Sequence, residues 1–387
     1  IMDSMDLEKE RGITITAKNT AIHYEGIKIN IMDTPGHADF GGEVERSLNL
    51  VDGALLLVDA SEGPLPQTRF GLKKTLERNL PVILVINKIN RSDARIEEVV
   101  NEVYDLFIDL DANDEQIDFS ILYTIAKDGI AHEDLNDGST TLKPLFDSIL
   151  NNIKGPVADD NQTPQFLVTN LDYDPYVGQV AIGRLNHGTL SMKKFYSLCG
   201  EDEIRNNQKF SALYTFEGLK KVQVEKLEAG DIIAVAGIED VTIGDTISSN
   251  EGPKPLPRIM IDEPTASMLF YVNNGPFAGK EGKYLTSRNI SERLDREILG
   301  NVSLQVRKTD RTDVFEVRGR GELQMAVLIE TMRREGYEFM VSKPRVITHE
   351  KDGKTMEPME KVFLDIPEDK VGVITEKLSI RKGRMDN

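Results

Sequence analysis

Hydrophobic residues in the first part of the chain form short apolar runs that alternate with segments of helical spacing. Residues 27–31 alternate between apolar and polar side chains, as a half-buried strand does, and residues 54–58 and 82–86 are continuous apolar runs. Apolar residues recur every three to four positions at 68–79 and 96–110, which predicts helices. Strands separated by helices in this way predict a parallel sheet covered on both faces, whose ligands bind beyond the carboxyl ends of the strands.

The pattern changes after the first 154 residues. Gly, Pro and Asp at 155–164 predict a linker, and the short β-rich segments of 165–251, separated by turn residues, predict a small antiparallel barrel. A Pro-rich break at 253–257 precedes a third unit, whose order of strand, helix, strand, strand, helix and strand predicts a split βαβ sandwich. Its six segments are 265–272, 287–299, 302–307, 314–318, 321–335 and 338–341. A further unit of this kind is expected to begin with a strand at 361–366.

These patterns predict a multidomain fold for the 387 residues: an α/β domain with a parallel sheet, an antiparallel β-barrel, an α+β split βαβ sandwich and the start of a second α+β domain. The predicted boundaries are 1–154, 165–256, 257–349 and 350–387. The chain starts at Ile1 and ends inside its last predicted unit, so we expect it to be part of a longer protein. One Cys and no run of ~18 apolar residues predict a protein of a reducing compartment, without disulfides or membrane spans.

Charge is distributed unevenly along the chain, and this changes what the net charge implies about binding to nucleic acid. The chain carries 47 basic and 65 acidic residues, a net charge of −18, and such a surface repels phosphates. Residues 1–154 hold 15 basic and 28 acidic side chains, a balance of −13, whereas residues 257–349 hold 15 and 13, a balance of +2. Contact with nucleic acid is therefore expected in the third unit and not in the first.

Polar residues follow the predicted strands where a nucleotide triphosphate would bind. Asp33 and Gly36 come directly after the strand at 27–32; a carboxylate there can hold a water of a Mg²⁺ shell, and a Gly lets a backbone N–H approach a phosphate oxygen. His37 stands where it can orient a water for attack on that phosphate. Upstream, the hydroxyl and carbonyl of Thr14 can reach Mg²⁺ and the γ-phosphate if their loop closes.

Two further loops have residues suited to a base. Asn87 and Lys88 end the run at 82–86, where the Lys stem can lie against a purine while Asn87 ties loops together. Ala126 follows another apolar run, and its backbone N–H can meet a carbonyl of the base. Four loops after four strands in this order indicate a guanine-nucleotide switch domain.

With these segments the sequence resembles the translational GTPases, and within them the BipA/TypA ribosome-associated family. Residues 2–15, 33–46 and 170–173 carry the resemblance together with 276–283 and 319–336, so that it covers nearly the whole chain. The first segments are shared with elongation factors, whereas the last two narrow the resemblance to the BipA/TypA family. The resemblance implies a P-loop-type GTPase domain at 1–154, a translation-factor barrel and an elongation-factor-like α+β domain.

The resemblance also implies roles for single residues. Thr14 would be the Mg²⁺ ligand of the first switch, Asp33 a Mg²⁺ ligand through water, Gly36 the γ-phosphate contact and His37 the residue that positions the attacking water, with Ile13 as half of an apolar gate beside it. The base would be read by Asn87, Lys88, Asn90 and Ala126. GTP would be the substrate and GDP the product, and the binding partner would be the ribosome. The protein would be a cytoplasmic monomer when it is not on the ribosome, and it would bind no membrane. The candidates for RNA contacts are the planar or flexible cations of the third unit, Arg318, Arg320, Arg333, Arg334, Lys343 and Arg345.

The sequence departs from the family at three places. No G-x-x-x-x-G-K-[ST] phosphate loop occurs in these residues, and without that cradle we expect the stretch alone to hydrolyse GTP poorly. The base-reading loop ends in Asn90 instead of the family's Asp, which predicts a weaker preference for guanine and better binding of xanthine. Ile125 replaces a Ser, which removes a side-chain brace but leaves the backbone N–H of Ala126.

The main hypothesis is a Mg²⁺-dependent GTPase of the BipA type that acts on the ribosome, with a role in ribosome assembly or stress adaptation implied by the family alone. One alternative is an elongation-factor or ribosomal-protection GTPase. A second, from another class, is a ribosome-binding module that no longer uses nucleotide, with Asn90 and Ile125 as marks of a decayed pocket. A metal-dependent phosphohydrolase built on Asp33, His37 and Asp39 ranks last, because no second carboxylate or His cluster completes a metal cage.

Overall fold

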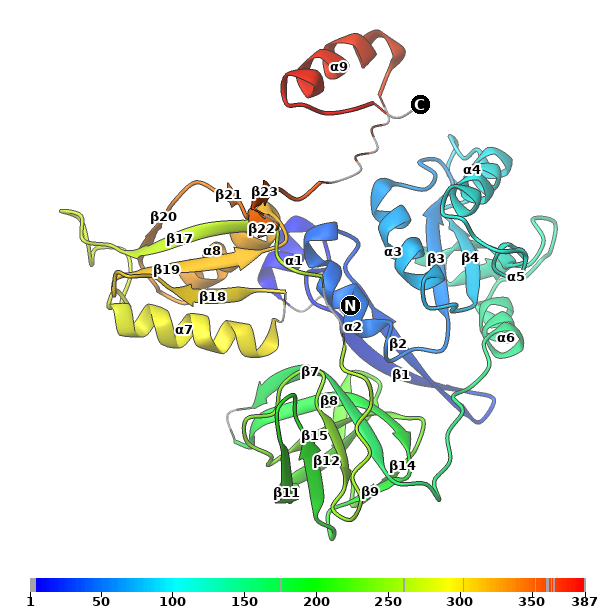
Figure 1. The fold of residues 1–387 in the computed structure, drawn as a ribbon. Helices are drawn as coiled ribbons and strands as arrows, with labels where there is room; N and C mark the ends of the chain where they lie inside the picture. Colours follow the sequence, from blue (N-terminus) through cyan, green and yellow to red (C-terminus); the bar gives the residue numbers. More distant parts are fainter. Residues whose placement is uncertain are drawn as a thin grey trace. The chain divides into compact units, whose positions relative to one another are not determined.

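The computed structural model describes residues 5–174, 176–259, 262–301, 303–351, 353–359, 362, 364 and 366–385. It divides into two compact units, Ile1–Ile347 and Thr348–Asn387, and each is described by itself. Within the described residues, no helix combines the length and the apolar character that crossing a bilayer requires. Figure 1 shows the elements coloured along the sequence.

The first part begins with helix α1 (Asp6–Arg11) and an antiparallel hairpin of β1 (Lys18–Tyr24) and β2 (Ile27–Asp33). Glu25 and Gly26 join the two strands with φ angles of 48° and 80°, the left-handed values of a two-residue hairpin turn. The prediction that residues 27–31 belong to a parallel sheet is therefore wrong. The two-residue connection reverses the chain, so β2 pairs antiparallel with β1. Among the described residues this pair forms a two-stranded sheet separate from the larger one (Figure 1).

The four-stranded sheet has the order β3 (Ala54–Asp59), β4 (Val82–Asn87), β5 (Ser120–Ile125) and β6 (Ile130–His132). The first three strands are parallel and β6 is antiparallel to β5, so the sheet is mixed. Helices α3 (Pro66–Leu76) and α4 (Ile96–Asp109) pack on one face, and α6 (Lys143–Asn152) packs against the other. The predicted parallel pairing of β3, β4 and β5 is confirmed, and β4 is buried on both faces. The prediction that residues 54–58 are buried throughout is wrong, because Leu55 and Leu57 are exposed on one face of β3.

The middle part is an antiparallel barrel. Its eight-stranded path runs β11-β10-β16-β7-β8-β15-β12-β13, and a short pair, β14 with β9, lies off it. Its core is built from large side chains such as Phe166, Leu185 and Tyr196. The strands are β7 (Gln165–Asp174), β8 (Gly178–His187), β9 (Thr189–Ser191), β10 (Tyr196–Cys199), β11 (Ile204–Gln208), β12 (Ala212–Glu217), β13 (Lys220–Gln223), β14 (Lys226–Glu228), β15 (Ile232–Ala236) and β16 (Thr246–Ser249).

The third part is the predicted split βαβ sandwich. Its sheet has the order β18-β19-β17-β20, with β21 paired to β17, and every pairing is antiparallel. The core lies between this sheet and helices α7 and α8, with Phe270 of the sheet and Leu294 and Met332 of the helices fully buried. The elements are β17 (Ala266–Val272), α7 (Ser287–Gly300), β18 (Gln305–Lys308), β19 (Val314–Gly319), α8 (Glu322–Arg334), β20 (Phe339–Val341) and β21 (Arg345–Val346). The strand predicted from residue 302 begins at 305, and 302 itself lies outside the described residues.

The second unit holds a hairpin of β22 (His349–Lys351) and β23 (Lys354–Met356), followed by helix α9 (Val371–Ile380). The hairpin is absent from the sequence prediction. The strand predicted at 361–366 falls partly on 361, 363 and 365, which lie outside the described residues.

Candidate functional site

His37 lies in the loop between β2 and helix α2 (Gly41–Ser47), at the start of a short 3-10 turn, Ala38–Phe40. Its Nδ1 accepts a hydrogen bond of 3.1 Å from the backbone N–H of Asp39. A neutral imidazole that accepts at Nδ1 carries its proton on Nε2. The half-exposed ring therefore offers an Nε2–H donor to a water or a phosphate oxygen.

An apolar cluster lies beside His37. The ring of Phe40 meets that of His37 edge to face, with centroids 6.2 Å apart. Phe40 is buried with Leu7 and Ile15, and Ile13 packs against this cluster, partly buried. Ile13 therefore packs against the apolar cluster that includes Phe40, and its role as a gate beside His37 stays a prediction.

The segment that carries Thr14 is held by one buried carboxylate. Glu8 of α1 has no exposed surface and forms an ion pair with Lys18. It accepts hydrogen bonds from the backbone N–H groups of Ile15 at 3.0 Å, Thr16 at 3.3 Å and Met5 at 3.2 Å. Sequence reasoning missed Glu8, because its capping box starts at a Met and not at the Ser or Thr that marks such a motif.

We expect the hold of Glu8 on this segment to weaken in acid. Burial by itself raises the pKa of Glu8, but hydrogen bonds from Lys18 and from the N–H groups of Ile15, Thr16 and Met5 bring it below the usual 4.5. A carboxylate whose pKa is lowered by folding stabilises above its unfolded pKa, and that stabilisation is lost as the pH falls through the folded value. Hydrogen-exchange protection factors at Ile15 and Thr16 should therefore be high at neutral pH. They should decrease when the pH falls below 4.5, the usual pKa of a Glu side chain. Glu8→Gln is the control, since it should remove this pH dependence; the same pH profile in both proteins would contradict the assignment.

The two loops expected to read a base are joined in the structure. Oδ1 of Asn87 accepts from the N–H of Ala126 at 3.0 Å and from Oγ1 of Thr124 at 3.1 Å. β4 and β5 are parallel neighbours, so these loops leave the same edge of the sheet. Asn87 therefore ties the loops together, and the N–H predicted for the base carbonyl is engaged by Asn87 in this structure.

The other residues of the base-reading loop lie at the surface. Lys88 has a left-handed backbone, φ 62°, and its amine lies 2.7 Å from Oδ2 of Asp59 at the end of β3. Asn90 is exposed in the turn after β4, and Ile125 at the end of β5 is partly buried. The exposed amide of Asn90 is accessible to a ligand at the edge where Asn87 lies.

Gly36 is exposed, and the chain itself does not demand a glycine there. A Cβ on Gly36 would meet Gln67 of α3 at 3.5 Å, an ordinary van der Waals contact. A requirement for glycine at this position would have to come from a bound group and not from the fold.

The residues expected at the metal are Thr14 and Asp33. Both are partly buried, and Asp33 ends β2 opposite Lys18. A hydroxyl and a carboxylate are the oxygen donors that Mg²⁺ prefers, and two such donors fit an ion that keeps several waters and phosphate oxygens. Among the described residues, no group of three or more His, Cys, Asp and Glu side chains could hold a metal by itself.

Four of the six cations proposed for RNA are paired with carboxylates. Arg318 pairs with Glu316, and both side chains are partly buried; the exposed Arg333 pairs with Glu330. Lys343 and Arg345 are exposed.

Arg320 and Arg334 join the third part to the first. Arg320 is largely buried and lies 3.2 Å from Glu45 of α2 and 3.0 Å from Asp262. Arg334 binds Glu10 of α1 through two contacts of 2.8 and 2.6 Å. In this structure carboxylates of the protein hold both guanidinium groups, so a phosphate would have to replace these ion pairs; RNA contact by Arg320 and Arg334 stays a prediction.

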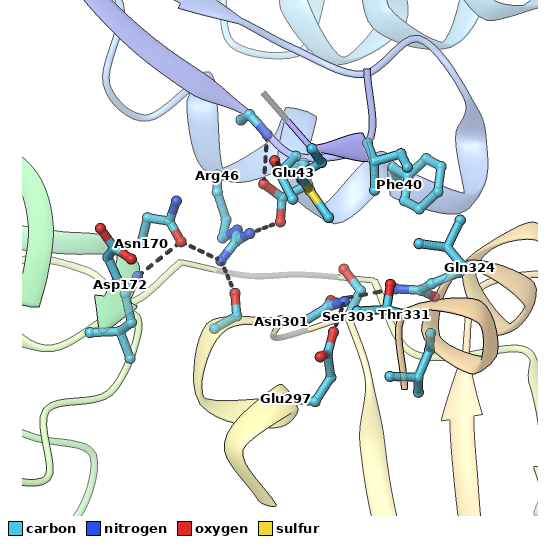
Figure 2. A pocket seen from close by; sticks show the side chains of 18 of the residues that line it. Phe40, Glu43, Arg46, Asn170, Asp172, Glu297, Asn301, Ser303, Gln324 and Thr331 are labelled. Carbon is cyan, nitrogen blue, oxygen red and sulfur yellow. Dashed lines mark hydrogen bonds and ion pairs between the residues drawn. The ribbon is translucent and has the colours of Figure 1, made fainter. Parts of the chain in front are cut away.

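A cavity of about 580 Å³ lies where the first, middle and third parts meet (Figure 2). Arg46 of α2 is 3% exposed and forms an ion pair with Glu43. Its Nη1 donates to the carbonyl of Gly300 in α7 at 3.0 Å and to Oδ1 of Asn170 in β7 at 3.4 Å. Glu43 also accepts from the N–H of Ala17 at 3.0 Å. Burial lowers the pKa of Arg46 to about 10, so it stays charged at neutral pH.

Comparisons with known proteins agree with this architecture. Residues 1–155 match the elongation factor Tu GTP binding domain, and residues 164–250 match elongation factor G domain 2. A crystal structure of a Thermus thermophilus protein has a similar fold, with a TM-score of 0.66 over 92% of this chain and 65% of its own, at 18% identity. The predicted multidomain fold, with an α/β domain, an antiparallel barrel and an α+β domain, is confirmed.

Three curated relatives are similar to this chain along its whole length, and each is named a large ribosomal subunit assembly factor BipA. The protein of Bacillus subtilis is 50% identical over 384 residues, that of Synechocystis 50% over 387 and that of Salmonella typhimurium 48% over 387, covering 99–100% of this chain. The chain spans 63–65% of the length of these relatives. An identity near one half across three successive domains, with the switch-like loops inside the aligned region, places the chain in a family: it belongs to the BipA family of translational GTPases.

Proposed function

We propose that the protein containing this chain is a Mg²⁺-dependent GTPase of the cytoplasm that binds the ribosome and acts in assembly of the large ribosomal subunit. The observation that carries the proposal is its identity of about one half to large-subunit assembly factors over the whole chain. The loop geometry supports the chemistry, since residues suited to a nucleotide follow β2, β4 and β5. Hydrolysis is proposed for the full-length protein and not for this chain alone, because these residues contain no phosphate loop. That the full-length protein has such a loop is a prediction from the family.

The roles proposed for single residues follow from their positions. Thr14 and Asp33 would hold Mg²⁺, which supplies charge neutralisation at the phosphates when bound. Gly36 would approach the γ-phosphate with its N–H, and Nε2–H of His37 would donate to the attacking water or to a phosphate oxygen. Asn87, Lys88, Asn90 and Ala126 would contact the base, and Ile13 would exclude water beside His37. The proposed RNA contacts of the third part are Arg318, Arg320, Arg333, Arg334, Lys343 and Arg345, and the four paired arginines would exchange a carboxylate for a phosphate. We also propose a monomer away from the ribosome.

The test is the rate of ribosome-stimulated GTP hydrolysis by the full-length protein. A positioned acid–base or orienting group contributes typically ~10²–10⁴-fold, so His37→Ala should lower kcat by about 100-fold or more while GTP affinity changes little. His23→Ala is the matched control, because His23 is an exposed histidine of β1 that contacts Glu217 of the barrel. Equal rates for His37→Ala and His23→Ala would refute the role of His37.

A second candidate is a ribosome-binding module that does not use nucleotide. Two observations favour it: the N–H of Ala126 is engaged by Asn87, and Asn90 stands where the family has Asp. Equilibrium binding of a fluorescent GTP analogue to the full-length protein separates the two candidates. Mg²⁺-dependent affinity supports the GTPase, and its absence supports the module.

A further inference from the structure

Asp39 lies between His37 and helix α8 of the third part. Its backbone N–H donates to Nδ1 of His37, and its carboxylate Oδ2 accepts from the N–H of Leu323 at 2.8 Å and of Gln324 at 3.3 Å. The His37 loop and α8 are far apart in sequence, since Leu323 comes 284 positions after Asp39. One residue thus connects the proposed catalytic ring to another domain.

The first turn of α8 lacks a cap of its own. The residue before the helix is Gly321, which has no side chain to accept from the first N–H groups. Those groups carry the partial positive charge of a helix start, so a carboxylate binds them well. Asp39 supplies the cap from outside.

Gly321 makes this approach possible. Its φ of −169° is extended backbone that any residue adopts, so no conformational reason requires glycine. A Cβ on Gly321 would lie 2.2–2.3 Å from the three carboxyl atoms of Asp39, which is closer than atoms can approach. The absence of a side chain at 321 therefore serves the contact with Asp39.

The rest of α8 also packs on the segments around the site. Val327 is buried with Ile15 and Phe40, and Leu323 packs against the same cluster. At the other end of the helix Arg334 binds Glu10 of α1. The helix thus contacts the loop of His37 and the segment that leads to Thr14.

We propose that Asp39 is a positioning residue through which helix α8 holds His37 in one orientation, so that hydrolysis depends on docking of this helix. With its carboxylate bound to α8, Asp39 has a fixed backbone, and its N–H keeps Nδ1 of His37 as acceptor and Nε2–H directed outward. When α8 moves away, Asp39 loses these donors and the ring loses its orientation. The dependence is reciprocal, so a ligand that orders the loop of His37 also favours docking of α8. This proposal rests on the proposed role of His37 in GTP hydrolysis.

Gly321→Ala and Asp39→Ala in the full-length protein test the proposal. Both should lower kcat of ribosome-stimulated hydrolysis about 10- to 100-fold, the size of effect expected when a catalytic group is misplaced by an ångström. GTP affinity should change less than about twofold, because the residues that contact the base and Mg²⁺ are untouched. Asp39→Asn should recover part of the rate, since an amide oxygen still accepts from the helix. Gly71→Ala in α3 is the matched control, because a Cβ there meets no atom within 4 Å.

A measurement independent of activity is the ¹⁵N NMR spectrum of the histidine rings, of which this chain has 5. His37 should show the Nε2–H tautomer in the unmodified protein and a mixture of tautomers in Gly321→Ala. If His37→Ala itself leaves hydrolysis unchanged, the proposed role of His37 fails while the NMR result still tests the positioning. An unchanged tautomer together with an unchanged kcat in Gly321→Ala would overturn the inference.

Discussion

Replacing Asn90 with Asp should raise the affinity of the full-length protein for GTP about ten- to a hundredfold. Guanine presents two donors on one edge, its N1–H and its 2-amino group, and a carboxylate accepts from both. The amide of Asn90 accepts from one and sets its own NH₂ group against the other. A donor left without a partner costs about 1–3 kcal/mol, which corresponds to this range of affinity.

The same reasoning predicts the opposite result for xanthine, which has a carbonyl oxygen where guanine has its amino group. The amide of Asn90 matches that edge with one acceptor and one donor, so XTP should compete better than GTP before the substitution and worse after it. Competition of the two nucleotides against a labelled analogue measures this. Asn101→Asp on the exposed surface of α4 introduces the same charge and should change neither affinity. Undiminished selectivity for GTP in the unmodified protein would exclude the prediction.

Replacing Arg46 with Ala should lower the free energy of the first unfolding transition in urea by about 3–5 kcal/mol, the usual cost of removing one member of a buried ion pair. The substitution leaves the carboxylate of Glu43 buried without its partner and the carbonyl of Gly300 without its donor. Because Arg46 contacts α2, β7 and α7 at once, the loss should appear as earlier separation of the three parts. Limited proteolysis between them should become faster.

Two comparisons show whether the effect comes from the buried charge. Arg288→Ala removes an exposed arginine paired with Glu292 on the surface of α7, and it should leave the transition unchanged. The double substitution Glu43→Gln with Arg46→Met removes both charges and should recover a large part of the loss, because it leaves no uncompensated ion. If Arg46→Ala behaves as Arg288→Ala does, the junction contributes little to stability.

Local patterns predicted the parts of the fold that depend on contacts between near neighbours in sequence. The runs at 54–58 and 82–86 became β3 and β4, and the order of elements after residue 265 became the split sandwich, because periodicity records which face of an element is buried. The error at 27–31 arose from turn chemistry: Glu25 and Gly26 turn the chain back within two residues, and an apolar run alone does not tell which neighbour a strand pairs with.

The sequence by itself determined the loops where nucleotide chemistry is expected, since Asp33, Gly36, His37 and Asn87 stand directly after strands. Only the tertiary structure decided how those loops are held. Arg46 binds the carbonyl of Gly300, which lies 254 positions later in the sequence, and Asp39 binds α8 at a still greater separation. No local sequence pattern predicts either contact. It also decided that Arg320 and Arg334 bind carboxylates within the chain, because a charge in a sequence shows neither its burial nor its partner. The physical reason is that ion pairs and helix caps depend on the distance between atoms in space, which the chain sets only when its domains pack together.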